Sequence, residues 1–343
     1  MPGKDIAIDL GTSKIKVYVR GKGIVLSEAN AVTYEAGTNE IIAMGNSAGE
    51  MKGKLPDTLE TVWPVKNGII SDFSVMRQIL EAAIEKVCRR EVFKPDIIVS
   101  CPVGCTDLQK KTIIDVCAIA GAGKVYVLES PVASALGCAK VIEKPYGVMV
   151  IDIGAGTTDI AIITMNTVAY YSSLPIGGSN MDEAVRQYIR KERDILIGRQ
   201  TAEKIRLTAG CIYGDSEEVE LTAYGKDFVS GMPVSFTITS TEIKKALSDL
   251  LSQILSEIKS VLEEVPPELQ SDIHTEGIIL TGGCAYLRGL SDAIKDKTGV
   301  EVKVAEDALN TCVKGAGYAL KNMKNLEDNG YVFKMKEKDI TKI

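Results

Sequence analysis

Alternating apolar and polar residues predict strands in the first half of the chain, and apolar residues spaced three and four apart predict helices between them. The expected strands are Ile97–Cys101 and Val125–Leu128, and the expected helices are Thr106–Ala120 and Val132–Val141. This alternation is typical of an α/β sheet with helices on its faces.

The longest predicted helix is Thr241–Glu264, and its apolar residues recur at helical spacing. Pro266 and Pro267 should end it. The pattern favours a helix that packs on a sheet over one that binds a partner.

Two segments lack the long patterns of the sheet and predict smaller insertions. Residues 32–70 carry Gly, Pro and Asn without a strong helix, so we expect a strand-rich insertion there. Residues 181–240 should contain a helix, a turn-rich stretch at 210–216, and strands at Val219–Ala223 and Val234–Ile238. The charged end, residues 321–343, predicts a short helix and a loose tail.

Two short segments repeat one pattern 143 residues apart: Ile8-Asp9-Leu10-Gly11-Thr12-Ser13-Lys14 and Ile151-Asp152-Ile153-Gly154-Ala155-Gly156-Thr157-Thr158-Asp159. Each follows an apolar strand and leads into another, so both predict hairpin turns. Glycines let backbone N–H groups approach an anion, hydroxyls add donors, and aspartates can hold hydrated magnesium. The repeat indicates two related domains, each offering one loop to a shared phosphate cleft.

Other common phosphate-binding motifs do not fit these loops. The chain has no GxxxxGK[ST] segment, and a strand, not a helix, follows each hairpin. Asp159 also stands where a dinucleotide-binding fingerprint needs its last glycine. A third glycine loop follows the predicted buried strand Gly277–Leu280, and Tyr286–Lys297 should then form a helix.

Composition narrows the functional classes. The chain has 343 residues, 45% hydrophobic and 25% charged, which suits two or more packed domains. A net charge of −6 argues against general nucleic-acid binding. One histidine and eight scattered cysteines without a C-x-x-C pair argue against zinc sites and histidine triads. Neither a membrane-spanning apolar stretch nor a signal peptide is evident, so we expect a cytoplasmic protein.

Paired aspartate-glycine-threonine hairpins with a later glycine loop resemble the actin and DnaK-type ATPase superfamily. Longer stretches resemble the bacterial actin homologue MreB family, over about residues 5–320: Gly21–Leu26, Met181–Lys191, Thr201–Ile205, Pro266–Leu269 and Leu287–Leu290. The resemblance implies an actin-like ATPase fold of two related α/β domains with smaller inserted subdomains around a nucleotide cleft. The implied subdomains are IA (1–31, 71–142 and 315–335), IB (32–70), IIA (143–180 and 241–314) and IIB (181–240), with a tail at 336–343.

The resemblance also assigns the cleft. Asp9 and Asp152 would face each other and hold Mg²⁺ through water. The implied ATP or ADP contacts are Thr12, Ser13, Lys14, Gly154, Ala155, Gly156, Thr157, Glu203, Lys204, Ile205, Arg206, Gly282, Gly283, Cys284 and Ala285. Lys14 stands where the family usually has asparagine, and its side chain could contact phosphate or point to solvent. Ala155 and Cys284 each replace a usual glycine.

Ser130 is the departure with the clearest chemical consequence. The family has Glu-Glu-Pro where this chain has Glu129-Ser130-Pro131, and the glutamate next to proline is the one implied to activate water. A serine hydroxyl is not a base near neutral pH. Asp159 remains as the candidate to orient water, and hydrolysis should be slow. Alternatively, a family of slow ATPases tolerates variation here.

Arg89, Arg90, Val92, Phe93 and Lys94 form a basic and apolar loop that, in the MreB family, touches the membrane. The alternative is an ordinary surface loop. The implied function is an ATP-binding subunit of membrane-associated, head-to-tail filaments, single or paired, that governs cell shape together with cell-shape membrane proteins at the inner face of the membrane. The alternative is a non-polymerising ATPase of the superfamily, like a sugar kinase or a DnaK-type chaperone.

Overall fold

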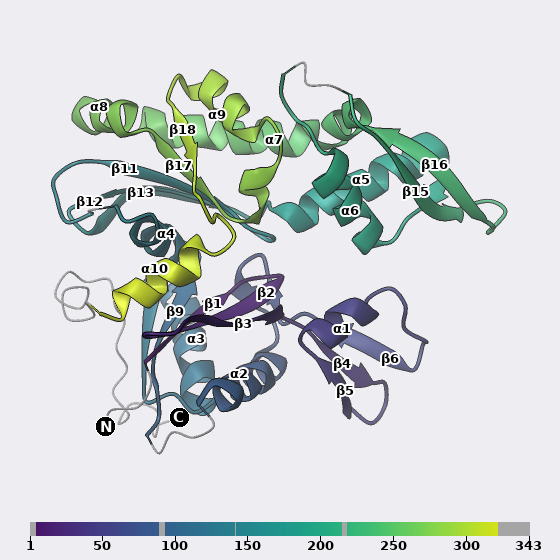
Figure 1. Ribbon diagram of the computed structural model, residues 1–343, viewed down its shortest axis with the longest axis horizontal. Coiled ribbons are helices and arrows are strands. Elements are labelled where there is room, and N and C mark those ends of the chain that lie inside the picture. The colour runs from purple at the N-terminus through teal and green to yellow at the C-terminus, as the bar shows by residue number, and fades with distance from the viewer. Residues whose placement is uncertain (1–4, 89–92, 141, 215–217, 322–343) are drawn as a thin grey trace.

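The computed structural model describes residues 5–88, 93–140, 142–214 and 218–321. Two α/β halves lie one above the other in Figure 1, and a smaller insertion extends from each half toward the same side. The halves are built on two five-stranded sheets with the same arrangement of strands. This is the mixed α/β architecture that the sequence pattern predicts.

The first sheet has the order β10-β9-β1-β2-β3. Its strands are β1 (Ile6–Leu10), β2 (Lys14–Val19), β3 (Gly23–Ala29), β9 (Asp96–Cys101) and β10 (Lys124–Glu129). β1 is antiparallel to β2 and parallel to β9. The tight β1–β2 connection is therefore the hairpin that the first glycine segment predicts.

The second sheet has the order β13-β12-β11-β17-β18. Its strands are β11 (Val148–Ile153), β12 (Thr158–Thr164), β13 (Thr167–Leu174), β17 (Ile278–Thr281) and β18 (Val302–Val304). β11 is antiparallel to β12 and parallel to β17, as β1 is to β2 and β9. The repeat seen in the sequence thus extends to the topology of both sheets.

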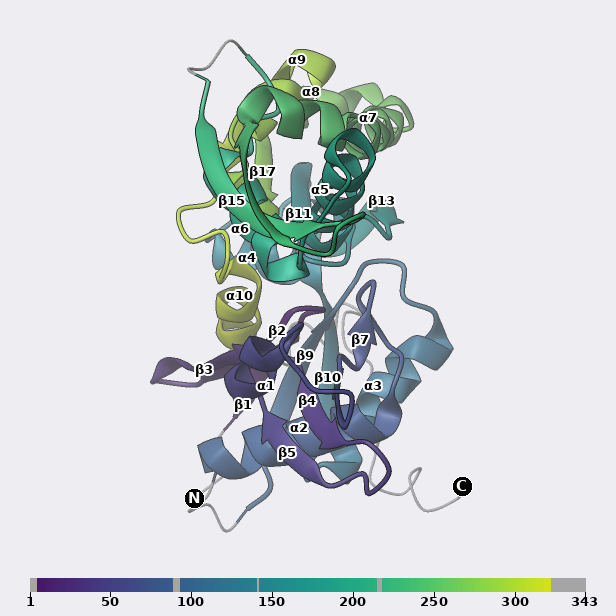
Figure 2. The ribbon, with the colours of Figure 1, turned by 90° about the vertical axis from the view of Figure 1, so that its right-hand side faces the viewer.

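Helices cover the outer face of each half and fill the space between the sheets. The first half carries α2 (Phe73–Cys88) and α3 (Asp107–Ile119), and the second carries α7 (Ser240–Glu263), α8 (Pro267–Glu276) and α9 (Leu290–Thr298). α4 (Ser130–Gly137) and α10 (Thr311–Ala319) lie between the halves (Figures 1 and 2). One hydrophobic cluster joins these two helices to strands of both sheets, so the halves share a core.

Glycines allow α4 and α10 to cross closely. A Cβ at Gly315 would lie 1.7 Å from the carbonyl oxygen of Ala133, and one at Gly137 would lie 2.2 Å from that of Thr311. Any larger residue at these positions would push the helices apart. Because the helices join the two sheets, this crossing fixes how the halves meet.

The two insertions consist of short strands and helices outside the two five-stranded sheets. The first contains β4 (Val32–Glu35), β5 (Ile41–Met44), α1 (Asn46–Met51) and β6 (Leu59–Val62), followed by the short strands β7 (Val65–Lys66) and β8 (Ile69–Ile70). The second contains α5 (Gly178–Arg193), β14 (Ile195–Leu196), α6 (Arg199–Ala209), β15 (Glu220–Asp227) and β16 (Pro233–Thr239). Gln200 Nε2 donates to the Gly49 carbonyl oxygen at 3.2 Å, so the two insertions touch.

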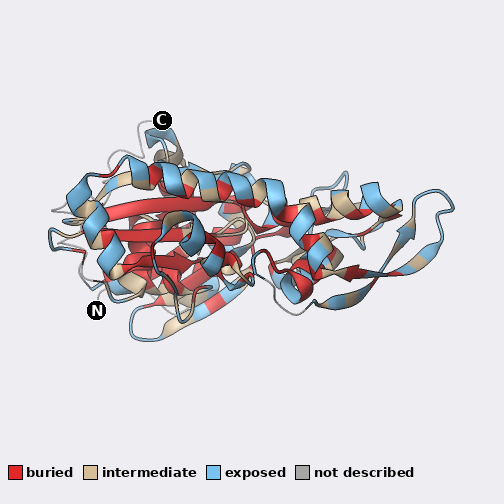
Figure 3. Ribbon diagram, turned by 90° about the horizontal axis from the view of Figure 1, so that it is seen from above, coloured by how far each residue is buried: buried red, intermediate tan, exposed pale blue. Residues whose placement is uncertain are grey.

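The long predicted helix is confirmed as α7. Thr239 caps it, and Glu242 completes the capping box through the Thr239 N–H. Its turns alternate between buried and exposed residues, as Figure 3 shows, because one stripe of apolar side chains packs into the core.

Two local predictions were wrong in detail. The helix expected at Val132–Val141 begins at Ser130, because Pro131 is tolerated in a first turn, and ends at Gly137. The helix expected at Tyr286–Lys297 is two elements, the 3₁₀ turn η1 (Gly283–Tyr286) and α9, because Gly289 is left-handed between them. The first insertion is rich in strands, as predicted, and its helix α1 has only six residues. The helix and tail predicted for 321–343 lie outside the described residues, apart from Lys321.

Candidate functional site

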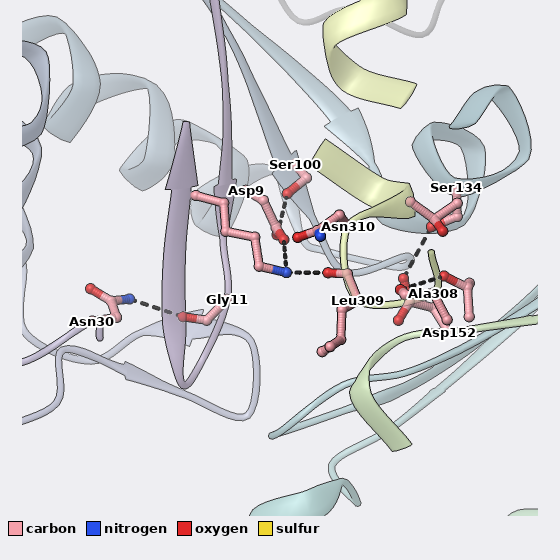
Figure 4. A network of polar contacts seen from close by, with 12 residues as sticks. Asp9, Gly11, Asn30, Ser100, Ser134, Asp152, Ala308, Leu309 and Asn310 are labelled. Carbon is pink, nitrogen blue, oxygen red and sulfur yellow. Dashed lines mark hydrogen bonds and ion pairs between the residues drawn. The ribbon is translucent and has the colours of Figure 1, made fainter. Parts of the chain in front are cut away.

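The first hairpin is anchored on both sides of its turn. Ser100 Oγ donates to Asp9 Oδ1 at 2.9 Å, and Asn30 Nδ2 donates to the Gly11 carbonyl oxygen at 2.9 Å (Figure 4). Asn30 is fully buried, and its Oδ1 has no partner in the described part of the chain. These bonds fix the turn, so Thr12 and Ser13 are presented at the edge of the sheet.

The second hairpin has an equivalent anchor. Ser134 Oγ, from α4, donates to Asp152 Oδ2 at 3.1 Å (Figure 4). The Gly154 N–H donates to the Thr157 carbonyl oxygen at 2.9 Å and closes the turn. The Ser179 N–H at the start of α5 donates to the Ala155 carbonyl oxygen at 2.8 Å. A serine from a neighbouring element therefore holds the aspartate of each hairpin.

The fold brings the two hairpins into contact. A Cβ at Gly156 would lie 2.3 Å from Thr12 Oγ1, so only glycine lets the turns approach this closely. The Gly68 N–H, after β7, donates to the same Thr12 oxygen at 3.1 Å. Residues from three distant parts of the chain thus meet at one point.

Carboxylates concentrate beside this contact. Burial, with the charges of Asp159 and Asp9, raises the pKa of Asp152 to about 7. Burial also raises the pKa of Asp159 to about 6, although hydrogen bonds from Ser173 Oγ (2.6 Å) and Thr157 Oγ1 (3.2 Å) favour its ionised form. A bound cation would relieve this repulsion.

Lysine residues of the first hairpin differ in their surroundings. The Lys14 side chain is exposed, the second of the two alternatives that the sequence left open. Lys16, which the sequence analysis did not select, is 8% exposed. Its Nζ donates to the Leu309 carbonyl oxygen and lies 3.9 Å from Asp9 Oδ2.

Ser130 begins α4, and its hydroxyl donates to the Cys101 carbonyl oxygen at 2.9 Å. The neighbouring Glu129 pairs with Lys110 at 3.1 Å, so its carboxylate is already engaged. Asp159 is 3% exposed and lies close enough to Asp152 to raise that pKa. Among the residues considered for water activation, Asp159 is the carboxylate beside the hairpins.

The residues expected at the adenosine differ in how accessible they are. Glu203 and Lys204 are exposed on α6, whereas the Ile205 side chain is buried in the core of the second half. Arg206 is 5% exposed; its Nε donates to Asp182 Oδ1 at 2.6 Å and its Nη1 lies 3.9 Å from Cys284 Sγ. The buried pair of Arg206 and Asp182 holds α6 against α5. The sequence analysis did not select Asp182, although it lies in the matching stretch 181–191.

The glycine loop after β17 lies directly against the second hairpin. Gly282 has φ +88°, and a Cβ there would lie 2.5 Å from Asp152 Oδ1. Cys284 Sγ contacts the Gly154 carbonyl oxygen at 3.4 Å, and burial raises the pKa of its thiol to about 11. Gly283 is half-buried and Ala285 is buried beside them.

A nucleotide and magnesium fit this set of residues. Glycine at 156 and 282 lets the second hairpin and the loop after β17 lie directly against Thr12 and Asp152, and a cation would offset the mutual repulsion of the aspartates. Within the described ranges, no group of three or more His, Cys, Asp or Glu side chains is arranged to hold a metal by itself. Mg²⁺ commonly uses one or two carboxylates with water and phosphate oxygens, and Asp9 and Asp152 offer that pair.

The predicted membrane loop lies partly outside the described residues. Arg89, Arg90 and Val92 belong to the undescribed part, while Phe93 is 59% exposed and Lys94 is exposed. Among the described helices, none combines the length and the apolar character needed to cross a bilayer.

Comparisons with known proteins identify the fold. The chain is similar to MreB5 of Spiroplasma citri bound to AMPPNP, with a TM-score of 0.91, 34% identity, and coverage of 96% of this chain and 99% of the other. The ADP-bound form of that protein gives a TM-score of 0.90. The MamK double helical filament, 20% identical with a TM-score of 0.80, shares the actin-like fold.

Sequence comparisons agree over nearly the whole chain. The cell shape-determining protein MreB of Escherichia coli (strain K12) is 39% identical over 326 residues, 93% of this chain and 94% of its own length. The cell shape-determining protein Mbl of Bacillus subtilis (strain 168) is 37% identical over 327 residues, 95% of this chain and 98% of its own length. The MreB/Mbl protein family profile matches residues 3–328. With the actin-like fold and the paired hairpins, these matches establish that the chain belongs to the MreB/Mbl family.

Proposed function

We propose that the chain is an ATP-binding subunit of actin-like filaments that attach to the inner face of the cell membrane and help to govern cell shape. The contact between the two hairpins, at Thr12 and Gly156, carries this proposal. It brings together two glycine hairpins, one from each half of the molecule, at the place where the nucleotide would bind. Relatives that bind AMPPNP and ADP, and relatives described as cell shape-determining proteins, support it.

The cleft residues divide into three roles. Asp9 and Asp152 would hold Mg²⁺ through its water molecules, and the turns at 12–13 and 154–157 would present hydroxyl and N–H groups to the phosphates. Arg206, Glu203 and the loop from Gly282 to Ala285 would border the adenosine. When bound, magnesium would neutralise phosphate charge.

Water activation is the weak step of this site. Asp159 can orient a water molecule through an ionised oxygen, whereas the Ser130 hydroxyl cannot accept its proton near neutral pH. We therefore propose slow ATP hydrolysis and filaments that persist with ATP bound.

In this proposal the subunit consists of the four subdomains IA, IB, IIA and IIB, with the residue ranges that the MreB resemblance implies. Subunits in the cytoplasm would join head to tail into single or paired protofilaments. The loop from Arg89 to Lys94 would contact anionic lipid at the inner face of the cell membrane. A filament multiplies a weak lipid contact, because each bound subunit raises the effective concentration of the next. Cell-shape membrane proteins are the proposed partners, and nucleic acid is not.

High-speed sedimentation and electron microscopy with ATP and magnesium test the proposal. The wild type should pellet as filaments, and Asp152→Ala should lose both magnesium-ATP binding and assembly. A wild type that binds ATP but never pellets would instead identify a non-polymerising ATPase of this superfamily. An Asp152→Ala protein with unchanged ATP affinity would remove the assignment of the cleft.

A further inference from the structure

Lys16 is the counterpart of Asp159 in the duplicated fold. Each lies seven residues after the aspartate of its hairpin, Asp9 or Asp152. In the sheets, Lys16 pairs directly with Asp9 and Asp159 pairs directly with Asp152. The two halves therefore place opposite charges at equivalent positions beside the cleft.

The equivalence extends to the strand on the other side of each aspartate. Asp9 neighbours Ser100 on the parallel strand β9, and Asp152 neighbours Thr281 on the parallel strand β17. Directly opposed residues in a sheet point to the same face. Lys16, Asp9 and Ser100 thus form one polar row across the first sheet.

The ammonium of Lys16 has an unusual environment for a lysine. The residue is 8% exposed, although lysine is rarely buried without a close partner. Asp9 is its carboxylate partner within the described residues, at 3.9 Å, which is longer than a direct hydrogen bond. The Leu309 carbonyl oxygen, from the segment between β18 and α10, accepts one of its three donors (Figure 4 labels Asp9 and Leu309).

The charge of Lys16 counteracts that of the neighbouring aspartates, because it favours the ionised form of Asp152. Asp9, Asp152 and Asp159 lie close enough for their charges to interact, and a nucleotide would bring several more negative charges among them. A buried ammonium with free donors offers phosphate oxygens charge-assisted hydrogen bonds. Exposed Lys14, two residues earlier, lacks this burial.

We propose that Lys16 binds the phosphates of a nucleoside polyphosphate and acts as a second, resident cation of the site beside the divalent metal. Nucleotide affinity then depends only partly on magnesium. This inference rests on the proposed nucleotide-binding function. It concerns a residue that the duplication of the fold singles out.

Titration calorimetry with ATP and with ADP, in magnesium and in EDTA, tests the role of Lys16. The wild type should retain measurable affinity in EDTA. Lys16→Met and Lys16→Gln should each lower that affinity by about 10–100-fold, because a hydrogen bond to a charged group contributes about 1.5–3 kcal/mol. The loss in magnesium should be smaller, and Lys16→Arg should restore part of the affinity.

Lys22→Met is the matched control, since it removes an exposed lysine of the adjacent β2–β3 turn. It should change nucleotide affinity neither in magnesium nor in EDTA. Melting curves of each variant establish that it is folded, and Lys16→Gln, whose uncharged side chain is shorter but keeps N–H donors, replaces Lys16→Met if that variant is not folded. A wild type that binds ATP only with magnesium, or Lys16 variants that bind in EDTA as the wild type does, would overturn the role of Lys16 and leave the proposed function standing. A wild type that binds no nucleotide under either condition would overturn the proposed function itself.

Discussion

Ser130 donates its hydroxyl hydrogen to the carbonyl oxygen of Cys101 at 2.9 Å, at the point where α4 begins beside β9. The residue that occupies the expected position of a water-activating carboxylate is thus used to join a helix to a strand. A hydroxyl engaged as a donor to a backbone carbonyl contributes packing and no base.

Ser130→Glu should therefore speed phosphate release under polymerising conditions, because it places a carboxylate where the MreB family has its water-activating glutamate, at the site where Asp9 and Asp152 are proposed to hold Mg²⁺. The gain should be at most about 10²–10⁴-fold, the usual contribution of a general base. Ser130→Ala is the control, since it removes the bond to Cys101 without adding a carboxylate and should show no gain. A fast wild type with no increase in Ser130→Glu would mean that another group activates water.

The raised pKa of Asp152 makes the stability of the nucleotide-free protein depend on pH. The folded protein keeps a proton on Asp152 up to about pH 7, whereas the unfolded chain loses it near the ordinary value of 3.8. The free energy of unfolding should therefore fall as pH rises through this interval. Asp152→Asn removes the effect and should exceed wild-type stability by about 1–3 kcal/mol above pH 7 and by little near pH 4.

Thermal melts in EDTA across pH 4–8 measure this difference. Asp249→Asn, an exposed position on α7, serves as the control and should give a constant offset from the wild type. If the Asp152→Asn offset is equally constant, Asp152 does not cause the expected fall in stability with rising pH.

The hydrogen bond from Gln200 to the Gly49 carbonyl oxygen connects the two insertions, one from each half of the molecule. Gln200→Ala should accelerate release of a fluorescent nucleotide by about 2–5-fold, because an exposed hydrogen bond contributes about 0.5–1 kcal/mol. Stopped-flow displacement by excess ATP measures the rate. Gln253→Ala, which removes a side-chain bond within α7, should leave it unchanged. Equal release rates in the wild type, Gln200→Ala and Gln253→Ala would show that the contact between the insertions does not slow the release of nucleotide.

Gly315 sets the distance between α4 and α10. Gly315→Ala should lower the free energy of unfolding by about 1–3 kcal/mol, since its Cβ would overlap the Ala133 carbonyl oxygen. Denaturant titration checks this value. Gly198→Ala adds a Cβ where no atom lies within 4 Å and should cost less than about 1 kcal/mol. Similar losses in both variants would contradict the close-packing explanation.

Phe93 exposes an aromatic side chain next to Lys94. Val92→Ser combined with Phe93→Ser should reduce co-sedimentation with anionic liposomes, because each inserted side chain contributes about 1.5–3 kcal/mol when fully buried. Filaments should form as before. Met165→Ser, which removes an apolar side chain of similar exposure (61%), is the control. Undiminished liposome binding by the double variant would identify an ordinary surface loop.

The sequence by itself determined the local elements and the family. Alternating residues and turn glycines act over a few neighbours, so both hairpins, the long helix α7 and the two insertions could be predicted from the chain alone. Matching stretches also assigned residues to a nucleotide cleft, and that assignment stays a prediction. Predicted helix boundaries were wrong where one backbone conformation sets the boundary. Gly289 is an example, because its left-handed geometry separates η1 from α9.

Only the tertiary structure decided which distant groups meet. The approach of Gly156 to Thr12, the bond from Gln200 to Gly49 and the engagement of Ser130 by Cys101 all join segments far apart in sequence. Lys16 shows the difference most clearly. Alternation places it on a strand, but its burial beside Asp9 and the Leu309 carbonyl follows from packing α10 and the second half against the first sheet. Burial and charge depend on the sum of long-range contacts, and no local pattern contains that sum.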